Sequence, residues 1–149
     1  MNGTTGDGPD ADVRRFGPAY TAALAGCLVS SVLTFAYVGG PARELNPVLR
    51  AVIDVIGLEL MVPLRVAVAA VGYWAYFVVA QVSDTGRAAV ALGWLTALVY
   101  VGDGLHDLRV AAAAGPPDPG VAAVGGLLLV VAAALGVALR PPTVVRGSA

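Results

Sequence analysis

The stretch PARELNPVLRAVIDVIGLELMVPLR, from Pro41 to Arg65, separates two long apolar segments and gathers charge beside them. Only 13% of the chain is charged, yet ionisable side chains recur in this stretch. Among them are Glu44, Arg50, Asp54, Glu59 and Arg65. The stretch predicts a boundary between two membrane helices, with polar groups close to hydrocarbon.

Composition places the whole chain in the membrane class. The 149 residues are 58% hydrophobic, with a mean hydropathy of +0.79, well above a soluble domain. Nearly uncharged runs of about 20 residues are long enough, as helix, to cross about 30 Å of hydrocarbon. The net charge of −1 argues against a nucleic-acid partner. We therefore predict one all-α domain, a polytopic membrane protein without intrachain disulfides, because Cys27 is the single cysteine and is expected to be buried.

Four transmembrane spans are predicted, at about residues 17–39, 58–80, 87–108 and 121–139, within a domain covering 14–140. Residues 1–13 are expected to be a disordered tail and 141–149 a C-terminal tail. Spans in lipid need small residues for close contact. The candidates are Gly26, Gly72, Gly93, Gly125, Gly126 and Gly136.

A short interfacial helix is predicted between the first two spans. Asn46 can cap a helix that Pro47 begins. From Pro47 to Ile56 the apolar residues leave Arg50 and Asp54 on the opposite side, a pattern typical of a helix lying in the membrane interface. Gly57 then offers a bend into the second span.

Arginine counts predict the orientation. One side of a four-span arrangement carries Arg14, Arg15, Arg87, Arg140 and Arg146, and the other carries Arg43, Arg50 and Arg109. The positive-inside rule then puts both termini in the cytoplasm and the protein in the cell membrane.

The same topology gathers polar residues at one membrane face, where the first and third spans end and the second and fourth begin. The candidate polar cluster is Glu44, Asn46, Glu59, Arg65, Asp103, His106 and Asp107. Arg65 could pair with Asp103 or Asp107 and lock the second span to the third. Intramembrane ionisable groups also mark ligand or ion sites.

A divalent metal is the one cofactor that the sequence suggests. Asp103, His106 and Asp107 stand at i, i+3 and i+4, on one helical face. An imidazole with carboxylates suits a divalent metal, and Glu59 or Glu44 could complete the set. The same groups could supply a general base, with Arg65 stabilising charge. The chain has no HExxH, GxSxG or P-loop motif.

Hydroxyl groups mark the first span. Ser30 and Thr34 are four residues apart and share a face. Hydroxyls in membrane helices usually bond to carbonyls of the preceding turn, which we expect here. The alternative is that they line a site.

Residues 30–69, SSVLTFAYVGGPARELNPVLRAVIDVIGLELMVPLRVAVA, resemble a family of small four-helix membrane proteins of unknown function from archaea and bacteria. Thr34 and the Glu-x-Asn-Pro formed by Glu44, Asn46 and Pro47 match the family pattern. Arg65 stands where the family has lysine, which keeps the charge but excludes a neutral amine. Ser30 stands where it has aspartate. The resemblance covers about residues 28–108 and implies an architecture rather than an activity.

These observations favour a non-enzymatic structural or accessory membrane protein, in contact with the lipid bilayer and with a membrane-protein partner or a second copy. One alternative is a small ion- or ligand-binding or transport module, although no polar stripe crosses a whole span. The other is a metal-dependent intramembrane hydrolase that uses Glu59, Asp103, His106 and Asp107.

Overall fold

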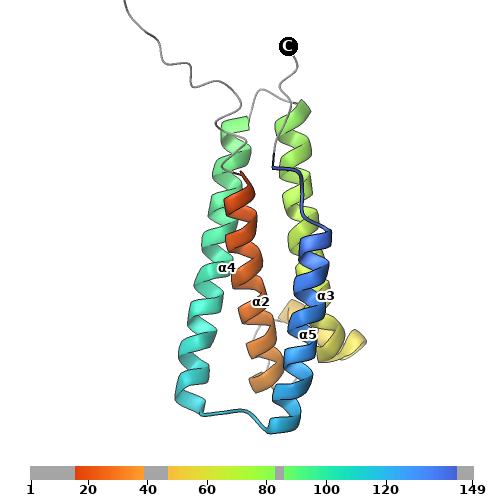
Figure 1. Cartoon of the computed structure of the whole chain (residues 1–149), viewed down its shortest axis with the longest axis vertical. Helices are drawn as coiled ribbons and strands as arrows, with labels where there is room; N and C mark the ends of the chain where they lie inside the picture. The colour runs from red at the N-terminus through yellow and green to blue at the C-terminus, as the bar shows by residue number, and fades with distance from the viewer. Residues whose placement is uncertain (1–15, 39–46, 83–85, 144–149) are drawn as a thin grey trace, which may run out of the picture.

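The computed structural model describes residues 16–38, 47–82 and 86–143 and is all-α, as predicted. Its helices are α2 (Phe16–Val38), α3 (Pro47–Val82), α4 (Gly86–Ala114) and α5 (Pro119–Ala138). All four are long and apolar enough to cross a membrane. They run alternately up and down, so that the start of α2 and the end of α5 lie toward the same end of the bundle (Figure 1).

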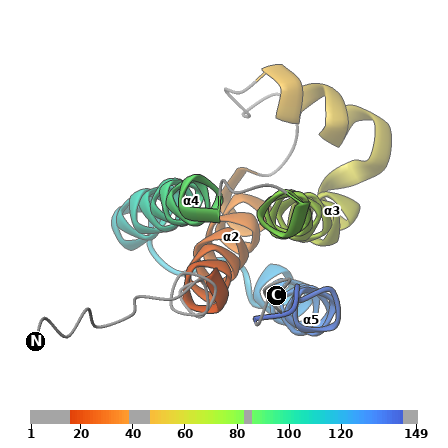
Figure 2. The same ribbon diagram turned by 90° about the horizontal axis from the view of Figure 1, so that it is seen from above.

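Helix α2 lies at the centre of the bundle. It contacts α3, α4 and α5, most extensively α4, whereas α4 and α5 scarcely meet (Figure 2). Phe16, Tyr20 and Tyr73 form the core toward the end where α2 begins, and Cys27 and Val62 belong to a second buried cluster. The outward faces carry exposed valines and leucines, as expected of helices that face lipid.

Small residues hold α2 against α4. The backbone of Gly26 lies against that of Tyr100 and Val101, and Gly104 faces the carbonyl oxygen of Gly26. On α4 the buried residues are Ala89, Gly93, Ala97 and Gly104. Such spacing lets two backbones approach closely in lipid. Of the predicted contact glycines, Gly26, Gly93, Gly125 and Gly136 have neighbours within 4 Å of an added β-carbon, whereas Gly72 and Gly126 face open space.

Glycine and aspartate set the ends of α4 and α5. Gly115, with φ +83°, follows the last residue of α4, where a left-handed residue often ends a helix. Asp118 caps α5, since its Oδ1 accepts hydrogen bonds from the backbone amides of Gly120 (2.8 Å) and Val121 (3.4 Å). The Tyr37 hydroxyl donates to the Gly115 carbonyl at 2.9 Å and thereby ties this connection to α2.

Helix α3 is broken at Gly57, where the predicted bend occurs. Gly57 has φ +82° and ψ 164°, a combination that essentially only glycine adopts. The residues before it, 47–56, leave the bundle at a steep angle (Figures 1 and 2). We call them the lateral segment. They carry the label α3 together with the residues that follow, but the non-helical Gly57 separates them from the upright part of that helix, and the predicted interfacial position stays a prediction.

Replacing Gly57 with alanine is expected to destabilise the fold. The added β-carbon is strained at this φ, at a cost of about 1–3 kcal/mol, and would lie 3.1 Å from Glu59 Oε2. Thermal unfolding in detergent measures the loss. Gly102→Ala is the control, because a β-carbon there meets nothing within 4 Å. Equal melting temperatures for the two variants would show that the bend is not required.

Candidate functional site

A hydrogen-bonded network joins three helices through one serine. The Ser30 hydroxyl on α2 donates to Asp107 Oδ2 on α4 at 2.7 Å. The same oxygen accepts a hydrogen bond from an Arg65 guanidinium nitrogen on α3 at 3.3 Å. Ser30 is only 3% exposed, and Arg65 and Asp107 are half-buried. The serine therefore links a cation to a carboxylate inside an apolar bundle.

The role of Ser30 differs from the one predicted. A hydroxyl has one hydrogen, and Ser30 directs it to Asp107 instead of to a carbonyl in its own helix. Thr21 shows the expected pattern, because its hydroxyl donates to the Gly17 carbonyl at 3.1 Å. The predicted direct pairing of Arg65 with Asp103 or Asp107 is not seen among the described residues, and Arg65 is instead linked to Asp107 through Ser30.

Further polar side chains surround this network. Cys27 is fully buried, as predicted, and its Sγ lies 3.9 Å from the hydroxyl of Ser31, which is also fully buried. Tyr100 packs against the cluster that contains Cys27, and Asp103 stands one helical turn before Asp107 on α4. Asp103 is exposed, so the site opens toward the surface on the α4 side.

The other predicted cluster residues lie apart from the network. Glu59 and His106 are exposed, and neither forms a hydrogen bond or ion pair with another residue that the structure describes. Glu59 follows the Gly57 break, about 9 Å along α3 from Arg65 at 1.5 Å per residue. Glu44 and Asn46 lie outside the described residues. The structure thus assembles Arg65 and Asp107, with Asp103 nearby, from the predicted set.

A metal centre is not evident in the described part of the chain. Within residues 16–38, 47–82 and 86–143, no three His, Cys, Asp or Glu side chains are grouped so that they could hold a metal ion. Asp107 instead accepts the hydrogen bond from Ser30. The metal set of Asp103, His106 and Asp107 stays a prediction.

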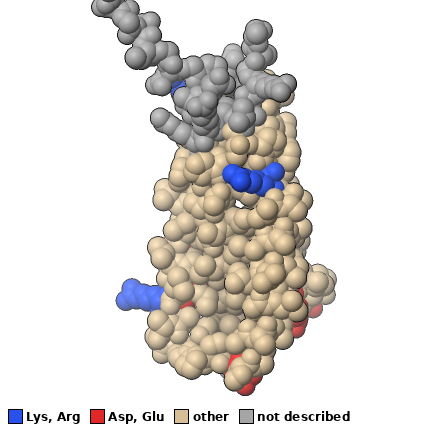
Figure 3. All heavy atoms as spheres, in the orientation of Figure 1, with Lys and Arg blue, Asp and Glu red and all other residues tan. Residues whose placement is uncertain are grey.

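The charged side chains lie mainly toward one end of the bundle. In Figure 3 the acidic groups on the visible face occur in the lower half, below a broad uncharged zone.

The sequence did not single out Ser30 as the link between helices, nor Tyr100 as a neighbour of the site. Both depend on how α2 and α4 are rotated against each other, which spacing does not encode.

Comparison of the chain with protein-family models, curated proteins and solved structures finds no match in any of the three. The site is therefore interpreted from its own chemistry.

Proposed function

We propose that this chain is a multi-pass protein of the cell membrane with a structural or accessory, non-enzymatic role and with both termini in the cytoplasm. Four apolar helices of sufficient length support the membrane location. The excess of arginine at the end where α2 begins supports the orientation. The resemblance to four-helix membrane proteins of unknown function is compatible with this role.

The observation that carries the proposal is the link from Arg65 through Ser30 to Asp107. Charged groups in apolar surroundings are costly unless they are paired or hydrogen-bonded. Here one guanidinium and one carboxylate share a buried hydroxyl, and each comes from a different helix. Hydrogen bonds to charged groups contribute about 1.5–3 kcal/mol each. We propose that the network locks the relative positions of α2, α3 and α4.

Removing the bridging serine or the arginine of this network is expected to destabilise the bundle. Ser30→Ala breaks both hydrogen bonds, and Arg65→Ala leaves the carboxylates without their cation. Each variant should lose about 1–3 kcal/mol, measured by thermal unfolding in detergent. A double-mutant cycle between Ser30→Ala and Asp107→Ala should give a coupling energy above about 0.5 kcal/mol.

His106→Ala is the matched control, because His106 is exposed and makes no described hydrogen bond. Its stability should equal that of the parent. Elemental analysis of gently purified protein adds an independent readout. A stoichiometric metal that is lost in His106→Ala, together with unchanged stability of Ser30→Ala, would contradict the structural role and favour the hydrolase.

A second candidate function is binding of a small cation or ligand. It is favoured by two carboxylates one helical turn apart on α4, Asp103 and Asp107, of which Asp107 is linked through Ser30 to Arg65. Uptake of common ions into proteoliposomes, reduced by Asp103→Asn, would support it. The lipid bilayer is a necessary partner in both cases. A second copy or another membrane protein could cover the exposed helix faces.

A further inference from the structure

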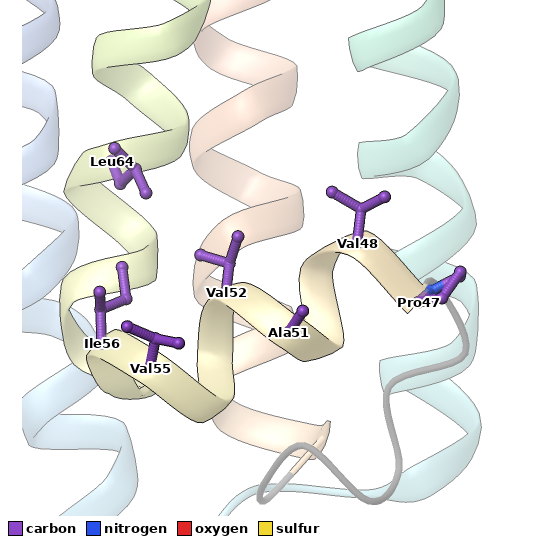
Figure 4. A pocket seen from close by; sticks show the side chains of 7 residues that line it. All are labelled: Pro47, Val48, Ala51, Val52, Val55, Ile56 and Leu64. Atoms are coloured by element: carbon purple, nitrogen blue, oxygen red, sulfur yellow. The ribbon is translucent and has the colours of Figure 1, made fainter.

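The lateral segment and the adjoining side of α3 form two sides of an apolar surface hollow of about 610 Å³, which is largely open to its surroundings. Its lining residues are Pro47, Val48, Ala51, Val52, Val55, Ile56 and Leu64. Figure 4 shows Val48, Ala51 and Val52 rising from the side of the lateral segment where Leu64 lies.

The lateral segment has two chemically different faces. Val48 is 70% exposed and Val55 is 84% exposed, and both line the hollow. Arg50 and Asp54 are exposed but do not line it. Ile53, in contrast, is buried. A helix with this pattern lies flat in a membrane interface, with its apolar face directed toward the acyl chains.

The hollow continues into the exposed apolar surface of α3. Leu60, Leu64, Val68 and Val71 follow one another at helical spacing along α3, and all are exposed. Water in the hollow would find almost no hydrogen-bonding partners on its aliphatic lining. Inside a bilayer, hydrocarbon or an apolar side chain is therefore the occupant that suits this lining.

We propose that a phospholipid acyl chain of the surrounding bilayer occupies this hollow. An acyl chain that runs along the exposed side of α3 and ends at the apolar side of the lateral segment would contact both surfaces. Leu64 belongs both to the lining of the hollow and to the exposed apolar row of α3, so the acyl chains that cover this row in a bilayer also reach the hollow. The inference rests on the proposed membrane location and adds the lipid contact that fixes the depth of the lateral segment.

Spin labelling in lipid vesicles tests this contact. Single cysteines replace Val52, Val55, Asp54 or Val68 in a Cys27→Ala background, and each is labelled with a nitroxide. The full chain is reconstituted into vesicles of phosphatidylcholine and phosphatidylglycerol. Accessibility to oxygen, which concentrates in hydrocarbon, is compared with accessibility to a water-soluble nickel chelate. Val52→Cys and Val55→Cys should favour oxygen as Val68→Cys does, several-fold more than Asp54→Cys.

Each other outcome is decisive. Nickel access at Val52 and Val55 would show water in the hollow and overturn the proposal. Low access to both reagents would show that protein covers it, and dipolar broadening between labels would identify a second copy. Nickel access at Val68, on the exposed face of α3, would instead contradict the membrane location itself. The two failures are therefore distinguishable.

Discussion

Gly26→Ala is expected to separate α2 from α4 and to prevent normal assembly of the bundle. A β-carbon at Gly26 would lie less than 3.0 Å from the carbonyl group of Tyr100 and the amide nitrogen of Val101. These are backbone atoms of a continuous helix and cannot rotate away. Overpacking a core by a single methyl group usually costs about 1–3 kcal/mol, and this contact should reach or exceed the upper end of that range.

Thermal unfolding and size-exclusion chromatography in detergent measure this effect. Gly102→Ala on α4 is the matched control, since its β-carbon would enter open space. Alanine is preferred over glycine within a helix by about 1 kcal/mol, so the control should be neutral or slightly stabilised. The two substitutions therefore differ in the sign of their effect. A Gly26→Ala protein as stable as the control would show that α2 and α4 do not approach as described.

Tyr73→Ala is expected to have the second large effect. Tyr73 is fully buried, and its ring packs against those of Phe16, Tyr20 and Tyr76 with centroid separations of 5.5, 5.2 and 5.7 Å. Removing a buried aromatic ring costs about 3–5 kcal/mol in protein cores, mostly through the cavity that it leaves. The melting temperature should fall far more than for Val71→Ala, which removes an exposed side chain from the same helix.

Tyr73→Phe distinguishes the contribution of the ring to stability from that of the hydroxyl. The hydroxyl donates toward the carbonyl oxygens of Ala19 on α2 and Gly93 on α4. Its loss should cost about 1 kcal/mol, while the ring contacts remain. If Tyr73→Phe were as damaging as Tyr73→Ala, the hydroxyl rather than the packing of the ring would dominate.

The helices could be predicted from the sequence because the hydrocarbon core of a bilayer sets a minimum length for a spanning helix and disfavours charged side chains within it. Proline and glycine then marked where spans end, and Gly57 marked a bend that the structure contains. The helix that contains the third predicted span is longer than that span, since α4 continues past residue 108 as far as Ala114. The alanines beyond the charged residues favour helix, and the helix ends only where Gly115 adopts a positive φ.

The site could be predicted only in part. The predicted up-and-down topology puts the ends of α2 and α4 beside the start of the upright part of α3. In the structure, Arg65 and Asp107 are indeed linked there through Ser30. It could not identify Ser30 as the bridge, because that depends on the rotation of each helix about its own axis. The same limit applies to the glycines, since Gly26 and Gly72 look alike in sequence but only Gly26 meets a neighbouring backbone.

The close contact between α2 and α4 also has a consequence for the order in which the helices assemble during synthesis. The most extensive partner of α2 is not the next helix in the chain but the one after it. While the ribosome is still synthesising α3, the side of α2 that contains Gly26 lacks its partner helix, because α4 follows later in the chain. Only after α4 has emerged can Gly26 meet Tyr100, so the order of synthesis makes assembly of this bundle a late event.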